Sequence, residues 1–283
     1  MPGNHITCRA CFTSEQARGG VDSATLKARH PFEIGTVPTH VAVVTAAADV
    51  QGDRVEVTVV GWGARKETWI IDHIVLVGRT SEDTVWRDLD EVLDRDWPRA
   101  DGGTMRIARL SVDSGCNTAK VYECVRSKPK VLVIAVKGRE SLDAALAAPK
   151  ITEINVRGQR IKRGVRLWQV GVNVIKADLQ GRLRLAVPTD DEIRAHGYPA
   201  GWIHFPMFAE NYFKQVCAEA CIVKASPMAP TKVQWVKQYP ANEAWDCLVY
   251  NVAAYMALGC HRWPENRWGK SSKSHRSLEW DVV

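Results

Sequence analysis

Residues 41–63 constrain the fold more than any other stretch of the chain. They begin with an almost wholly apolar run, Val41-Ala-Val-Val-Thr-Ala-Ala-Ala, which ends in Asp49. Such a run is typical of a central strand that is covered on both faces. In residues 54–62 valine alternates with polar side chains, which predicts a strand that returns antiparallel beside the first. A carboxylate is costly to bury without a partner, and our hypothesis is that Asp49 is a metal ligand.

The rest of the pattern predicts a mixed α/β fold. The apolar stretch 104–113 also ends in an acid, Asp113, and a helix at 118–126 followed by an apolar strand completes a βαβ unit with parallel pairing. A further helix is expected after Ser81, which we take as its cap, because apolar side chains follow it at helical spacing. The expected five-stranded sheet, flanked by helices, has its strands at residues 41–49, 54–62, 67–77, 104–113 and 131–136.

The chain divides into an arm, one large domain and a tail. Residues 1–38 lack sustained periodicity and are interpreted as an N-terminal arm or linker, and residues 261–283 as a basic C-terminal tail. The domain spans residues 39–260. Residues 139–235 interrupt the succession of sheet strands and helices in this domain and are interpreted as an insertion. Within it we expect a hairpin at 152–172 and helices at 173–185 and 207–223. The last strong element is a helix at 242–258.

Composition and charge narrow the class of protein. The 283 residues carry a net charge of +6, with basic residues concentrated at 157–166 and in the tail, which suits a polyanionic partner, although solvated surface explains the charge equally well. No apolar run is long enough to span a bilayer and the start lacks a signal peptide, so we expect a cytoplasmic protein without a membrane partner. Cys8 and Cys11 have the spacing of half a zinc site, but no second pair follows.

Three aspartates stand in apolar company at the ends of elements: Asp49, Asp113 and Asp246. If the strands that end in Asp49 and Asp113 run parallel, the two acids emerge at one edge of the sheet, and the last helix packed across that edge adds Asp246. Hydrolysis of a phosphodiester by two metals needs cations about 3.5–4 Å apart. Hard oxygen ligands suit Mg²⁺ and Mn²⁺. Taken singly, each acid is better explained as a cap, but the three together favour a metal site.

Two further side chains are candidates for the same site. Glu243 lies three residues before Asp246 on the same helix face, as an additional ligand or, slightly favoured, as an acid that stabilises the helix N-terminus. Lys137, at the end of the fifth strand, would stabilise a phosphate or, equally well, extend its ammonium to solvent.

Six short motifs then resemble a known family: the C-terminal nuclease domain of the large terminase subunit of lambda-type tailed phages. They are Thr45-Ala-Ala-Ala-Asp49-Val-Gln51, Val59-Val-Gly-Trp-Gly63, Val112-Asp-Ser-Gly115, Ala135-Val-Lys-Gly138, Ile203-His-Phe-Pro206 and Asn242-Glu-Ala-Trp-Asp-Cys247. Each is weak alone, but their order over about residues 35–258 is specific.

The resemblance implies a ribonuclease H-like fold and two divalent cations, Mg²⁺ or Mn²⁺, on Asp49, Asp113 and Asp246. It implies cutting of concatemeric, double-stranded viral DNA during packaging. It also implies a packaging ATPase, a small terminase subunit and the capsid portal as partners, in the host cell cytoplasm. The basic hairpin, with Arg157, Arg160, Lys162 and Arg163, would then contact the DNA backbone.

The sequence also departs from that family. Such terminases carry an N-terminal packaging ATPase, but no G-x-x-x-x-G-K-[ST] motif occurs here, and Trp268-Gly-Lys-Ser-Ser272 lacks the upstream glycine. We expect translocation by ATP to reside elsewhere. Two other functions stay open: a Holliday-junction resolvase or integrase-like enzyme with the same acids, and a non-catalytic module that docks to DNA or to the portal.

Overall fold

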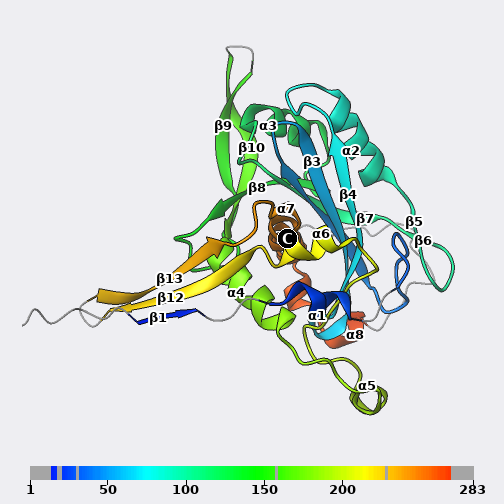
Figure 1. The fold of residues 1–283 in the computed structure, drawn as a ribbon. Helices are drawn as coiled ribbons and strands as arrows, with labels where there is room; N and C mark the ends of the chain where they lie inside the picture. The colour runs from blue at the N-terminus through cyan, green and yellow to red at the C-terminus, as the bar shows by residue number, and fades with distance from the viewer. Residues whose placement is uncertain (1–13, 18–20, 30–31, 157–158, 227–228, 269–283) are drawn as a thin grey trace, which may run out of the picture.

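A computed structural model describes residues 14–17, 21–29, 32–156, 159–226 and 229–268. Its centre is an eight-stranded sheet with helices on both faces (Figure 1). The strand order is β11-β4-β3-β2-β7-β8-β10-β9. The strands of this sheet are β2 (Val43–Val50), β3 (Arg54–Trp62), β4 (Thr68–Val77), β7 (Ile107–Asp113), β8 (Val133–Arg139), β9 (Lys150–Val156), β10 (Gln159–Gly171) and β11 (Ile203–His204).

The pairing directions follow the prediction at the centre of the sheet. β2 and β3 pair antiparallel, as do β3 and β4, which gives the expected meander. β2 pairs parallel with β7, and β7 pairs parallel with β8, so the βαβ unit joins the meander through β2. The mixed α/β fold, consistent with a ribonuclease H-like nuclease, is confirmed.

The predicted sheet was too small. The hairpin formed by β9 and β10 is no separate insertion in space, because β10 pairs parallel with β8 and extends the main sheet. β11 adds a short parallel strand at the other edge, beside β4. Strand pairing of this kind joins segments distant in sequence, and the period of a single strand carries no information about its partner.

Three predicted elements need correction. The helix expected at 207–223 is only α6 (Glu210–Val216), and the chain then forms β12 (Glu219–Ser226), where pairing with β13 replaces the helical pattern. The stretch 104–113 is broken into β6 (Thr104–Met105) and β7. Asp83, and not Ser81, occupies the position before α2, and its side chain makes no capping hydrogen bond.

The helices form two layers. α2 and α3 lie on one face of the sheet, and α4, α6 and α7 on the other, each layer with its own core of buried side chains. The helices are α1 (Ser23–Lys27), α2 (Thr84–Asp94), α3 (Thr118–Ser127), α4 (Val172–Leu183), α5 (Asp190–His196), α6 (Glu210–Val216), α7 (Glu243–Ala257) and α8 (Glu265–Trp268), with 3-10 turns η1 (Ala64–Lys66) and η2 (Cys260–Arg262). No helix in these described segments is both long and apolar enough to cross a bilayer.

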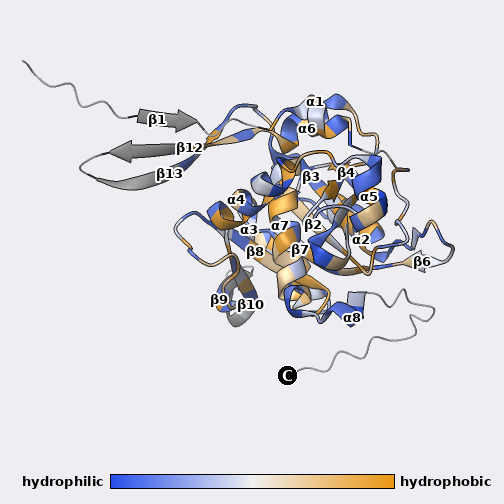
Figure 2. Cartoon of the chain, turned by 90° about the horizontal axis from the view of Figure 1, so that it is seen from below, coloured by the Kyte–Doolittle hydropathy of each residue, from blue (hydrophilic) through white to orange (hydrophobic). Residues whose placement is uncertain are grey.

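Helix α7 packs across β2, β3 and β7 and is mostly hydrophobic (Figure 2). A buried polar link fixes its position. The Asn251 amide donates to the backbone oxygen of Thr58 at 2.9 Å and accepts from the Thr45 hydroxyl at 2.8 Å. The Trp62 indole donates to the same hydroxyl at 2.7 Å. Because buried polar groups are costly without partners, this network specifies one register of α7 against the sheet.

Two smaller sheets complete the fold. β1 (Ser14–Ala17), β12 and β13 (Ala229–Lys237) form a three-stranded sheet that projects from the body (Figure 1). β5 (Trp97–Pro98) pairs with β6. Residues 21–29 of the predicted arm pack against the body: Leu26 is fully buried, and the buried Arg29 guanidinium donates to the backbone oxygens of Leu183 and Leu185. The boundaries of the arm, the domain and the tail stay predictions.

Candidate active site

Asp49 and Asp113 lie on adjacent parallel strands, on the face that α7 covers. Ala48 is in register with Val112, so the acid that follows each of them occupies the same level of the sheet. Val44, Ala46 and Ala48 belong to the core beneath α2 and α3, whereas Val43 and Ala47 belong to the core beneath α7. Side chains alternate along a strand, which places Asp49 toward α7.

Helix α7 brings the third acid to the same edge. Asp246 lies in its first turn, and Tyr250 follows one turn later. The Tyr250 hydroxyl is hydrogen-bonded to Asp113. Burial raises the pKa of Tyr250 well above its usual value, and the neighbouring negative charges of Asp113, Asp246 and Asp49 raise it further. Tyr250 therefore stands among all three predicted ligands, which shows that the fold brings them together.

The electrostatics of the three carboxyls are those of a crowded acidic group. Burial, followed by the charge of Asp246, raises the pKa of Asp49 to about 8, against a hydrogen bond from Gln51 that lowers it. Burial also raises the pKa of Asp113, opposed by the Gly115 amide. Burial raises the pKa of Asp246 to about 6, which the charge of Lys176 opposes. Without a cation the site therefore holds at least one proton at neutral pH.

Hydrogen bonds fix the two strand acids. Asp49 is 5% exposed, and the Gln51 side-chain amide donates to its Oδ2 at 2.5 Å. Asp113 is 8% exposed, and the Gly115 amide donates to its Oδ2 at 3.0 Å. A Cβ at position 115 would lie 2.6 Å from that oxygen, so any larger residue would displace the Asp113 carboxylate from this position.

The donor set fits hard divalent cations, which prefer carboxylate oxygens. Asp49 is surrounded by other carboxylates, and a bound cation would neutralise part of their negative charge. Within the described segments, however, no three His, Cys, Asp or Glu side chains already stand at the spacing of a metal site. The acids are thus neighbours whose mutual repulsion is only partly offset, by Lys176 and Lys137, and the predicted ligand roles stay predictions.

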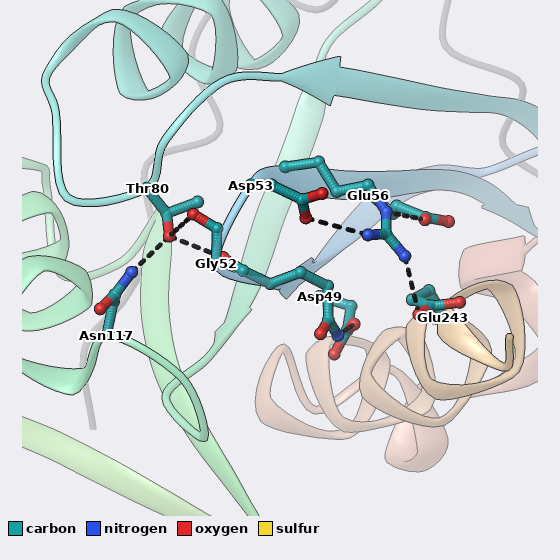
Figure 3. Close-up of polar contacts among 9 residues, drawn as sticks. Asp49, Gly52, Asp53, Glu56, Thr80, Asn117 and Glu243 are labelled. Carbon is teal, nitrogen blue, oxygen red and sulfur yellow. Dashed lines mark hydrogen bonds and ion pairs between the residues drawn. The ribbon is translucent and has the colours of Figure 1, made fainter. Parts of the chain in front are cut away.

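Arg54 connects the turn after β2 to the start of α7 (Figure 3). Its guanidinium donates to Glu56 Oε1 at 2.7 Å, to Glu243 Oε1 at 2.9 Å and to Asp53 Oδ1 at 3.0 Å. The other oxygen of Glu243 is buried and has no hydrogen-bond partner. Glu243 also contributes to the raised pKa of Asp49, so it lies at the edge of the acidic group. This position is compatible with both predicted roles, an additional metal ligand and an acid that stabilises the N-terminus of α7.

The turn that carries Gln51 is held from the opposite side (Figure 3). The Thr80 hydroxyl donates to the backbone oxygen of Gln51 at 2.6 Å, and the Asn117 side-chain amide donates to Thr80 Oγ1. Asn117 has a left-handed backbone, φ 42°, and immediately precedes α3. Hydrogen bonds therefore connect the loops that follow β2, β4 and β7, next to Asp49.

Sequence reasoning missed a second group of residues beside Asp246. Lys176 on α4 is 9% exposed, and its ammonium lies 2.7 and 2.8 Å from the two carboxylate oxygens of Glu219 and 3.7 Å from Asp246 Oδ1. The Asn242 side-chain amide donates to both Asp246 and Glu219 at 2.9 Å. The sequence did hold one signal for this group: a lysine on the buried face of a helix needs an acidic partner, because a buried charge is costly without one.

Comparison with known proteins identifies the family. Residues 9–268 match the family described as "Terminase large subunit gpA, endonuclease domain". The chain belongs to this family. It is 29% identical over 247 residues to the large terminase subunit of Escherichia phage lambda, covering 86% of this chain and 36% of that protein. It is 30% identical over 232 residues to that of Enterobacteria phage P21, covering 80% of this chain and 34% of that protein.

The terminase relatives are longer than this chain, which spans about a third of their length. No solved structure matches the chain. The resemblance recognised from the six motifs is confirmed, and the matched region includes all three aspartates.

Of the remaining predicted site residues, Lys137 lies near Asp113, and the side chains of the basic hairpin fall outside the described residues. Lys137 is half-buried at the end of β8, and its charge lowers the pKa of Asp113. Arg157 and the side chains of Arg160, Lys162 and Arg163 lie outside the described residues, so DNA contact by this hairpin stays a prediction. Cys8 and Cys11 also lie outside them. His204, in the fifth of the six motifs, is buried and stacks on Trp69.

Proposed function

We propose that this domain is a metal-dependent endonuclease that cuts double-stranded viral DNA by two-metal phosphodiester hydrolysis during genome packaging. One observation carries the proposal: Asp49, Asp113 and Asp246, from three separate elements, converge at one sheet edge with raised pKa values. Stable folding gains nothing from such a group of acids. Membership of the terminase endonuclease family supports the same reading.

Asp49, Asp113 and Asp246 would hold the cations. Two divalent cations at such carboxylates supply Lewis acidity to the phosphate and lower the pKa of bound water. The protein contributes the placement of the ligands. Gln51 and the Gly115 amide orient the strand acids, and Asn242 with Lys176 orients Asp246. Lys137 would favour the approach of a phosphate through its positive charge.

The direct test uses purified protein with linear and supercoiled DNA, in Mn²⁺, in Mg²⁺ and in EDTA. We expect cutting that requires the cation and that falls at least about a thousandfold in Asp49→Asn, Asp113→Asn and Asp246→Asn, since each removes a ligand. Asp53→Asn is the matched control, because Asp53 lies in the same turn with an exposed side chain. Persistent cutting by an Asp49→Ala, Asp246→Ala double variant would disprove the assignment.

The same assay separates the alternatives. A strong preference for four-way junctions over linear duplex would favour a resolvase. A docking module would bind DNA without cutting it, and calorimetry would detect no Mn²⁺ binding that depends on the three aspartates.

We further propose that the domain acts beside a packaging ATPase, a small terminase subunit and the capsid portal in the host cytoplasm. The support is that its relatives are large terminase subunits, of whose length the match to this chain covers 36% and 34%. Co-purification of this chain with the proteins encoded beside it tests the proposal, and the absence of all three partners would oppose it.

A further inference from the structure

A pocket of about 410 Å³ lies at the end of the sheet away from the acids. It is enclosed by the C-terminal turn of α3, the loop before β8, the start of β7 and the hairpin of β9 and β10, which lie together in Figure 1. Arg109 lines it, four residues before Asp113 on β7. At about 3.3 Å per residue, the two residues are separated by about 13 Å along the strand.

The rim of this pocket is cationic. Arg109, Arg126, Lys130 and Arg166 line it, and no acid is among the lining residues. Arg109 is committed to structure, since its guanidinium donates to the backbone oxygens of Ala257 and Val131. The other three are exposed, and the ion pairs found within the described segments do not include them. Their charge is therefore available to an anion.

The floor and walls of the pocket are apolar. Ile151 is 57% exposed and Val131 is 47% exposed, although both are large aliphatic side chains, and the half-buried Trp168 lines the same space. Exposed apolar surface rimmed by charge marks a binding site for a ligand with an apolar body and a charged group. A duplex is too wide to enter a pocket of this volume, whereas one unpaired base can.

We infer that this pocket binds one nucleotide unit, with the base against Ile151, Val131 and Trp168 and the phosphate on Arg126, Lys130 and Arg166. The unit belongs to a free nucleotide or to an unpaired strand of DNA, which share this chemistry. In the second case the inference deepens the proposed function, and it rests on that function: the pocket retains a single-stranded end at a distance from the acids.

The test measures binding to the full chain carrying Asp49→Asn, in EDTA, by fluorescence anisotropy of a labelled 12-nucleotide single strand. We expect Lys130→Glu and Arg166→Glu each to weaken binding about fivefold or more, because each reverses a phosphate-facing charge. Arg194→Glu is the matched control, exposed on α5 far from the pocket in Figure 1. Ile151→Ser should weaken binding of the single strand and of dTMP but not of inorganic phosphate.

The competitors identify the ligand. Displacement by dTMP at a lower concentration than by inorganic phosphate supports the nucleotide, and retention of the single strand over blunt duplex assigns the source to DNA. Binding of dTMP without the single strand assigns it to a free nucleotide. Equal displacement by dTMP and phosphate, or charge reversals no stronger than Arg194→Glu, would overturn the inference. Because no cutting is measured, failure of the nuclease assay leaves this result unchanged.

Discussion

Asp49→Asn should make the cation-free protein more stable at neutral pH. The pKa of Asp49 is raised from 3.8 to about 8 in the folded chain, so the folded state holds this proton more tightly than the unfolded state. Stability contributed at this residue is then lost as pH rises from about 4 to about 8. At 1.36 kcal/mol per pKa unit, the higher proton affinity of the folded state lowers its stability by about 4 kcal/mol at pH 7 relative to pH below 4.

The amide removes this cost while keeping the size of the side chain. Thermal or urea unfolding in EDTA, from pH 4 to pH 8, measures it. We expect Asp49→Asn to gain stability over wild type progressively across this range, with a gain of about 1–4 kcal/mol at pH 7. Asp53→Asn, whose side chain is exposed in the same turn, should show no such pH dependence.

Addition of Mn²⁺ should make wild type more stable than Asp49→Asn. A cation that binds only the folded state stabilises it by mass action, and wild type retains the ligand that Asp49→Asn lacks. Equal stability of the two proteins at every pH in EDTA would refute the reasoning about burial. A Mn²⁺-induced rise in Tm of the same size in both would refute the assignment of Asp49 as a ligand.

Two further predictions concern the scaffold and are measured by urea unfolding. Lys176→Met should lower the free energy of unfolding by about 3–5 kcal/mol, because it leaves the buried Glu219 without its ion pair. Lys214→Met, in an exposed pair, should lower it by less than about 1 kcal/mol. Equal losses in the two variants would contradict the role of burial. Gly171→Ala, at the junction of β10 and α4, should destabilise by about 1–3 kcal/mol, since its Cβ would lie 2.2 Å from a backbone oxygen. Gly181→Ala, in open space within α4, should stabilise by about 0.5–1 kcal/mol. The prediction fails unless Gly171→Ala lowers and Gly181→Ala raises the free energy of unfolding.

The sequence by itself determined the central elements. The apolar run before Asp49 and the alternating valines after it are local patterns that predict two strands, and both strands form. The alternation in β3 does not predict its burial, because Glu56 and Thr58 are buried as well as the valines. The same holds for α7, where apolar side chains predict a buried helix. The acids at the element ends were visible for the same reason, because a carboxylate beside an apolar run is locally anomalous.

Only the tertiary structure decided what those acids meet. Parallel pairing of β2 with β7 places Asp49 beside Asp113, and this pairing joins residues more than 60 positions apart. Lys176 and Glu219 come from elements whose own patterns say nothing about Asp246, and the segment containing Glu219 was misread as helix.

The physical reason is that burial and periodicity act within a segment, whereas strand pairing and charge compensation act between segments. The pKa of Asp49 is set by groups brought from β7 and α7 as well as by burial. The cationic pocket likewise joins α3, β7 and β10, which are separate segments of the sequence. The local pattern of residues thus indicated which side chains are unusual, and the fold decided which of them act together.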